Sequence, residues 1–212
     1  MVLGANDGLL STASLLVGVA AASAGTEVLL ASGIAALVAG AGSMAMGEYS
    51  SVSSQRDAER AELRTEAEEL RRAPEAELQE LAAIYEGRGL PSELALEVAR
   101  ALTEHDALGA HARDELGLDP EVLSEPVDAA VTSAVSFTLG ALLPISIVLV
   151  AHQSIRVPAL FLATVAGLAA LGAVAARLGR AQMGRAALRV VLGGTAAMAV
   201  AGVVGQLFDV AV

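Results

Sequence analysis

The stretch GSMAMGEYSS, residues 42–51, joins two very different kinds of sequence without a turn signal. Before it, an uncharged run from Val28 to Met46 is long enough to cross the roughly 30 Å hydrocarbon core of a membrane. Directly after Gly47, Glu48 opens a region dense in charge. Because neither proline nor a cluster of turn residues marks the junction, we expect one continuous helix that leaves the membrane and enters water.

The composition of the whole chain agrees with a membrane protein that carries one acidic insert. Of 212 residues, 55% are hydrophobic and only 2% are aromatic, so the apolar mass is small residues that suit close helix packing in lipid. Residues 51–120 hold 17 of the 24 acids and 8 of the 13 basic residues, all of which are arginine. The acidic balance argues against nucleic acid as a partner, and the lack of cysteine excludes disulfides and thiolate metal sites.

Five apolar stretches are long enough to span a membrane, at about residues 8–24, 28–46, 127–151, 157–176 and 190–208. The first could be a signal peptide, but it has no basic lead and four more spans follow. The predicted fold is therefore an all-α integral membrane protein with five transmembrane helices and a three-helix cytoplasmic metal-binding insert between helices two and three. Its expected parts are residues 1–48, 49–120 and 121–212.

Arginine placement predicts the orientation of these spans. Arg177, Arg180, Arg185 and Arg189 lie between the fourth and fifth spans, which places that loop in the cytosol. The acidic insert and the N-terminus fall on the same side by parity. The expected location is the plasma membrane in a prokaryote, or the vacuolar membrane in a eukaryote.

The insert is predicted to form three helices that present carboxylates to one another. They cover residues 49–72, 75–86 and about 91–116, separated at Pro74 and at Gly87–Pro91. Steps of three or four residues place one stripe of acids on the first helix and a pair on the second; these are Glu62, Glu66 and Glu69, then Glu77 and Glu80. Facing carboxylates repel unless a cation lies between them, and such oxygen-rich sites suit divalent ions.

The third insert helix adds His111 and Glu115 at a spacing of four, with Glu104 on the same stripe. Two plainer interpretations stay open: a solvated helix face supported by Glu–Arg pairs, and a surface histidine. A di-iron oxidase would need Glu-x-x-His, and none of the three histidines has an acid three residues before it.

Three residues in or beside the apolar spans indicate an ion path. Asp7 and Glu48 are ionisable groups at membrane depth, where charge is costly and marks a pathway or site. Met44 lies one turn from Glu48, and its thioether favours a softer transition ion over Ca²⁺ or Mg²⁺, although methionine also fills gaps in cores. Without a Walker A motif or a nucleophilic triad, a transporter driven by a gradient fits better than an enzyme.

Several motifs closely resemble the vacuolar iron transporter family over essentially the whole chain. They are LGANDGLLST (3–12), SMAMGEYSSVSSQRD (43–57), PEAELQELAAIYEGRGL (74–90) and SFTLGALLP (136–144). The resemblance implies a homodimer that moves Fe²⁺, Mn²⁺ and other divalent ions such as Zn²⁺ or Co²⁺ out of the cytosol by proton antiport. It implies no permanently bound cofactor.

The resemblance also implies roles for individual residues. Asp7 and Met44 match the aspartate and methionine of the ion pathway. Glu48 has no such match, and its place at the end of the span makes it a candidate proton carrier. Glu66 with Glu69, Glu77 with Glu80, and Glu115 match the glutamates of the family's metal-binding insert. Where the family often has methionine, four residues before the last of these glutamates, this chain has His111, which alters ligand softness.

Two other kinds of protein remain possible from the sequence. A membrane-anchored metal sensor or buffer would use the same insert without transport, but an anchor needs neither Asp7 nor Met44. A structural membrane protein could instead use its acidic insert to recruit a basic partner, and metal binding by the insert would count against it.

Overall fold

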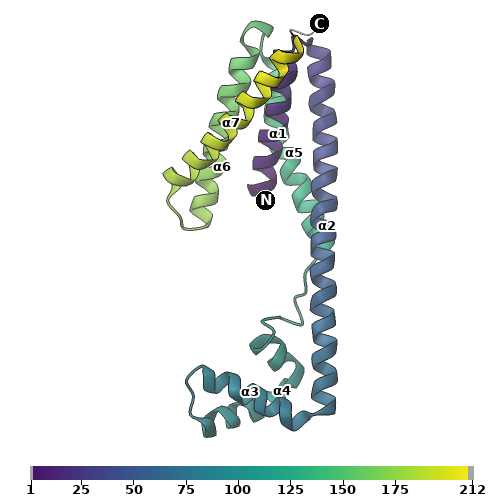
Figure 1. The fold of residues 1–212 in the computed structure, drawn as a ribbon, viewed down its shortest axis with the longest axis vertical. Helices are drawn as coiled ribbons and strands as arrows, with labels where there is room; N and C mark the ends of the chain where they lie inside the picture. The colour runs from purple at the N-terminus through teal and green to yellow at the C-terminus, as the bar shows by residue number, and fades with distance from the viewer. Residues whose placement is uncertain (1, 210–212) are drawn as a thin grey trace. The chain divides into compact units, whose positions relative to one another are not determined.

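The computed structural model describes residues 2–209, and every regular element within them is a helix (Figure 1). In chain order these are α1 (Val2–Ala21), α2 (Thr26–Arg72), α3 (Pro74–Gly87), α4 (Ser92–Asp114), α5 (Pro126–Val150), the short 3₁₀ helix η1 (Gln153–Ile155), α6 (Arg156–Leu178) and α7 (Met183–Asp209). Five of them, α1, α2, α5, α6 and α7, are long and apolar enough to cross a membrane. The prediction of an all-helical chain with five candidate spans is confirmed.

Helix α2 contains the junction between the apolar and the charged sequence. It runs without interruption through residues 42–51 and has 47 residues, which corresponds to a length of about 70 Å. Its first half is apolar and its second half is charged. The sequence around Gly47 lacks proline and turn clusters, and the structure has the single continuous helix that this predicted.

Two helices begin well before the apolar stretches that predicted them, whereas most other boundaries differ by only a few residues. Helix α1 already begins at Val2, so Asp7 lies within the helix, more than one turn from its start. Helix α7 begins at Met183, seven residues before the apolar stretch that predicted it. Both differences arise because hydropathy locates the part of a helix that suits lipid, whereas the hydrogen-bonded helix extends into flanking polar sequence.

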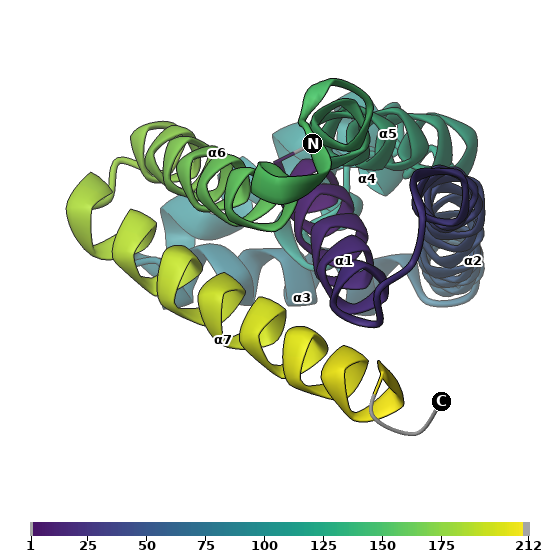
Figure 2. The same cartoon turned by 90° about the horizontal axis from the view of Figure 1, so that it is seen from above.

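The described chain divides into two compact units, one of residues 2–49 with 127–209 and one of residues 50–126. In the first unit α1 lies between the other helices (Figure 2). It crosses α5 at a very short distance, since a Cβ on Gly8 would lie 2.0 Å from the carbonyl oxygen of Phe137. Across the same contact, a Cβ on Gly140 would lie 2.0 Å from the oxygen of Ala5. Paired glycines thus bring the two backbones together, as in membrane helix pairs.

The second unit consists of the end of α2, helices α3 and α4, and the segment that leads to α5. Helices α3 and α4 pack around a small apolar cluster of Leu81, Ala82, Ala99 and Ala110. Pro74 begins α3 at a position where its missing N–H costs nothing. After α3, Gly89 adopts a positive φ of 100° that allows the chain to turn into α4.

Candidate metal centre

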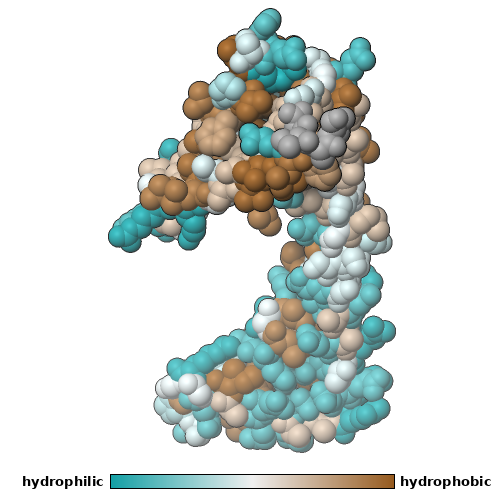
Figure 3. Space-filling model, turned by 45° about the horizontal axis from the view of Figure 1, so that its top comes forward, coloured by the Kyte–Doolittle hydropathy of each residue, from teal (hydrophilic) through white to brown (hydrophobic). Residues whose placement is uncertain are grey.

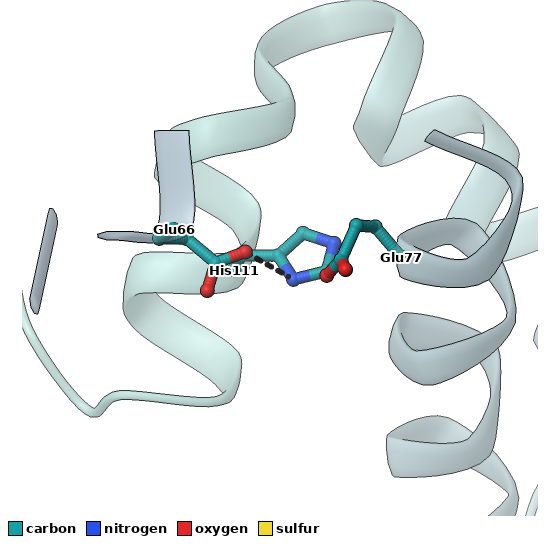
Figure 4. Close-up of side chains that lie close together, drawn as sticks. All are labelled: Glu66, Glu77 and His111. Carbon is teal, nitrogen blue, oxygen red and sulfur yellow. Dashed lines mark ion pairs between the residues drawn. The ribbon is translucent and has the colours of Figure 1, made fainter. Parts of the chain in front are cut away.

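Three helices of the second unit bring one side chain each to a common buried point (Figure 4). Glu66 comes from α2, Glu77 from α3 and His111 from α4, and their ligand atoms all lie within 4.8 Å of one another. The three residues are 3%, 9% and 0% exposed. Two carboxylates and an imidazole in this arrangement are the nitrogen and oxygen donors that divalent transition ions accept.

The imidazole of His111 lies between two carboxylates. Its Nδ1 is 3.0 Å from Oε1 of Glu66 and 3.0 Å from Oε2 of Glu115. Only the contact with Glu115 has the direction of a hydrogen bond, so Oε1 of Glu66 is buried without a hydrogen-bond partner. Nε2 of His111 is also buried and unpartnered. Buried polar atoms normally have partners, and a divalent cation would serve these two.

The carboxylates of this centre are held in an environment that opposes their negative charge. Burial, then the nearby charge of Glu115, raises the pKa of Glu66 above its ordinary value. Burial, then the charge of Glu80, raises the pKa of Glu77 in the same direction. The charge of Glu69 adds to the rise in both pKa values. A cation at this point would reverse the effect, because it favours the ionised form of each carboxylate.

A break in α4 aims His111 into the centre. Asp106 has non-helical backbone angles (φ −162°, ψ 87°), and its Oδ1 accepts a hydrogen bond of 3.0 Å from the backbone N–H of Gly109. A Cβ on Gly109 would lie 1.8 Å from the other carboxylate oxygen of Asp106, so only glycine fits beside this cap. Asp106 therefore starts a new helical segment, as an N-cap does.

This break corrects one prediction from the sequence. The third insert helix is not continuous over residues 91–116, so Glu104 does not share a helical stripe with His111 and Glu115. The physical reason is the competition of a short acidic side chain for a backbone N–H, which helical spacing alone does not reveal.

A second set of contacts fastens the end of α4 to the end of α3. The hydroxyl of Tyr85 donates a hydrogen bond of 2.7 Å to Asp114, and Arg88 forms an ion pair with the same carboxylate. The guanidinium of Arg88 also lies over the ring of Tyr85, 5.0 Å from its centroid. Asp114 is adjacent in sequence to Glu115, so these contacts hold the turn that carries both His111 and Glu115.

The other predicted insert residues lie around this buried point or outside it. Glu69 and Glu80 are exposed, but close enough to affect the pKa of Glu66 or Glu77. Glu62 is exposed on α2 and does not belong to the group of three. On the acidic stripe, Glu66 is therefore buried, Glu69 is exposed beside it, and Glu62 is exposed outside the group of three.

Glu59 is a buried acid whose role the sequence did not reveal. It is 8% exposed and accepts hydrogen bonds from the backbone N–H and the hydroxyl of Ser124, at 3.1 and 2.7 Å. The Ser124 hydroxyl is the main cause that lowers the pKa of Glu59, with Gln55 contributing less. These bonds tie α2 to the segment that follows α4. Their sequence separation of 65 explains why helical periodicity could not find them.

We predict that Ser124→Ala destabilises the second unit by about 1–2 kcal/mol, because a buried carboxylate loses a hydrogen bond. The lowered pKa of Glu59 means that this contribution is present above the ordinary glutamate range and is lost as the pH falls through the depressed value. Urea unfolding followed by hydrogen exchange of α3 and α4 at pH 7 and pH 3 measures both effects. Equal stability of the variant and the wild type at pH 7 would contradict the prediction; Ser54→Ala, whose hydroxyl bonds only its own helix, is the control.

Two cavities that mix polar and apolar lining residues lie in the first unit and share Met44. One of about 260 Å³ is lined by Asp7, Ser11, Ser43 and Met44, together with apolar residues. The other, of about 240 Å³, is lined by Met44, Glu48 and the α5 residues Thr132 and Ser133, among others. The structure therefore brings Asp7 of α1 beside Met44 of α2, and places Glu48 in an adjoining cavity.

The metal-free centre should lose stability as the pH rises. The raised pKa values of Glu66 and Glu77 mean that their favourable contribution is full below the ordinary value of 4.5 and disappears as the pH passes the raised values. We expect added Mn²⁺ to raise the thermal midpoint of the second unit more at pH 7 than at pH 5, since ions bind ionised carboxylates. Hydrogen exchange in α3 and α4 during heating measures this difference, and a larger shift at pH 5 would contradict it.

The chain is similar to one family of known proteins over nearly its full length. The family model described as the VIT family matches residues 1–206. A vacuolar iron transporter of Acanthamoeba castellanii is 42% identical over 98% of this chain and 77% of that protein. Vacuolar iron transporter homolog 5 of Oryza sativa subsp. japonica is 36% identical over 94% and 74%. Homolog 3 of Arabidopsis thaliana is 34% identical over 94% and 76%.

Proposed function

Because the chain belongs to the VIT family, whose members are transporters and not enzymes, we propose that it moves Fe²⁺ and Mn²⁺ out of the cytosol. The five apolar helices and the family support a multi-pass membrane protein. The relatives named vacuolar iron transporters favour iron as one substrate. In this proposal protons move in the opposite direction, and the functional form is a homodimer.

The observation that carries the proposal is the buried group of Glu66, Glu77 and His111. Its three ligands come from three helices, and two of their buried polar atoms lack a hydrogen-bond partner. A cation would relieve the repulsion that raises the pKa of both glutamates. In the proposal this centre collects the ion from the cytosol, with Glu69, Glu80 and Glu115 as further oxygen donors and Glu62 on the approach.

The ion then uses the cavities of the first unit. Asp7 supplies negative charge and Met44 a polarisable sulfur in the same cavity, a pair of donors that suits Fe²⁺ or Mn²⁺. Glu48 lines the adjoining cavity and is the proposed proton carrier. An ion passing a low-dielectric region needs such compensation, and the polar residues of these cavities would supply it.

Transport by the purified full chain in proteoliposomes tests the proposal. With a proton gradient imposed, Fe²⁺ and Mn²⁺ should accumulate on one side of the membrane, and a protonophore should reduce the rate. Metal accumulation that ignores the gradient would reject proton antiport while retaining transport. Metal binding without any accumulation would instead favour the membrane-anchored sensor, an alternative that leaves the two cavities of the first unit without a purpose.

A further inference from the structure

The turn between α6 and α7 carries four arginines that the proposed ion path does not use. Arg177 lies in the last turn of α6, Arg180 lies in the turn between the helices, and Arg185 and Arg189 are one helical turn apart near the start of α7. All four side chains are exposed. Helices α6 and α7 pack tightly just beyond them, since a Cβ on Gly172 would lie 2.9 Å from the Cα of Ala187. The four charges therefore gather at one end of this hairpin, which we call the arginine end.

The arginine end has no negative partner among the described residues of the first unit. No salt bridge or side-chain hydrogen bond involves these four residues there, and residues 129–208 contain neither aspartate nor glutamate. The second unit differs, because Arg72, Arg88 and Arg113 each pair with an acid. Four uncompensated charges within thirteen residues repel one another, so the arrangement favours an anionic ligand.

Apolar side chains border the arginine end on the same helices. Leu178 is 74% exposed, Met183 53% and Leu188 57%. Figure 3 shows the tip of the α6–α7 hairpin as a hydrophilic surface directly bordered by a hydrophobic one. Both helices are long enough to span a membrane. On such helices, a charged surface next to an apolar surface marks the boundary between headgroups and hydrocarbon, where arginine side chains extend toward the water.

The backbone of Arg180 has a conformation that usually favours glycine. It has a positive φ of 52° at the position after the end of α6, within a capping motif in which Ala181 N–H donates to Ala176 C=O. Glycine is the usual residue there, and glycine fills the matching position after α3 as Gly89. A long charged side chain in a left-handed conformation costs stability that glycine would save.

We propose that the arginine end is a binding site for the phosphate of an anionic phospholipid headgroup. Guanidinium groups present paired donors that match phosphate oxygens, and the exposed leucines would contact the acyl chains of the same lipid. A cluster of this kind at the membrane surface attracts anionic lipid strongly enough that each arginine contributes about fivefold to binding. None of the four arginines belongs to the buried group of Glu66, Glu77 and His111 or lines the two cavities that share Met44.

Native mass spectrometry of the purified full chain with added phosphatidylglycerol tests the proposal. We expect Arg185→Gln/Arg189→Gln to bind phosphatidylglycerol about 25-fold more weakly than the wild type. The matched control, Arg60→Gln/Arg100→Gln, removes two exposed arginines from the second unit and should bind like the wild type. Phosphatidylcholine should bind the wild type and both variants equally weakly.

Further arms separate the lipid from other sources of negative charge. Arg177→Gln/Arg180→Gln should show a similar loss, which keeps the test decisive if the first variant does not insert. Arg185→Lys/Arg189→Lys keeps the charge and should retain most of the binding. The proposal is overturned if millimolar inorganic phosphate displaces phosphatidylglycerol, if the control pair loses as much binding, or if phosphatidylcholine binds equally well.

Discussion

Replacing Glu66 and Glu77 together by glutamine will abolish tight metal binding and yet stabilise the metal-free second unit. Glutamine keeps the shape of glutamate but carries no charge, so the ion loses two of the three buried ligands. We expect the affinity for Mn²⁺ to fall by more than about 100-fold. Loss of a residue that only hydrogen-bonds to a metal ligand typically lowers the affinity by about 10- to 100-fold, and loss of the ligands themselves should cost more. The stability gain follows because the two carboxyls are buried and close to other acids, which already raises their pKa values.

Calorimetry and thermal unfolding of the full chain measure the two halves of this prediction. Glu75→Gln/Glu86→Gln is the matched control, because both residues are exposed on α3 and lie outside the buried group. Loss of binding together with loss of metal-free stability would indicate a purely structural role for the two glutamates. Wild-type affinity in the double variant would refute the metal centre itself.

Asp7→Ala and Met44→Ala will each slow metal transport while leaving metal binding at Glu66, Glu77 and His111 unchanged. Asp7 supplies the negative charge in the cavity that it shares with Met44. Without that charge a divalent ion would lose compensation worth several kcal/mol in a region of low dielectric, so we expect transport to fall by more than about 100-fold. Met44→Ala removes the sulfur donor from both cavities, and a loss of about tenfold is expected.

Initial rates of Mn²⁺ uptake into proteoliposomes, compared at equal protein incorporation, test this prediction. Asp128→Asn and Met46→Ala are suitable controls, because both residues are exposed and neither lines the two cavities. Undiminished transport by Asp7→Ala would remove the cavity from the ion path. A parallel loss of metal binding in either variant would show that the substitution disturbs more than the path.

Local patterns predicted the helices and most of the residues that meet. The uninterrupted sequence around Gly47 predicted the continuous α2, and helical spacing selected Glu66 and Glu77 as facing carboxylates. His111 entered the candidate set through its spacing to Glu115, and the two side chains are hydrogen bonded in the structure. The helices could be predicted because they depend on neighbouring residues, whose spacing fixes which side chains share one face of a helix. The roles of Glu66, Glu77 and His111 stay predictions.

Burial and long-range pairing were beyond the reach of such patterns. Helical spacing placed Glu62, Glu66 and Glu69 on one stripe and could not rank them by burial. Of the three only Glu66 is buried, because α3 and α4 cover that side of α2. The bonds from Glu59 to Ser124 join residues 65 apart in sequence, and no repeat or motif links them. The break in α4 at Asp106 depends on a side-chain cap. The carboxylate of Asp106 accepts a hydrogen bond from the backbone N–H of Gly109, in competition with the hydrogen bonds of a continuous helix.

The sequence by itself determined an all-helical chain with five apolar spans and an acidic segment rich in facing carboxylates. Hydropathy and helical period are properties of neighbouring residues, so they can be read along the chain. Only the tertiary structure decided that Glu66, Glu77 and His111 meet at one buried point. The tertiary structure likewise decided that Met44 lines both the cavity of Asp7 and the cavity of Glu48. Those arrangements depend on how separate helices pack, and packing is determined by the shapes of many distant side chains together.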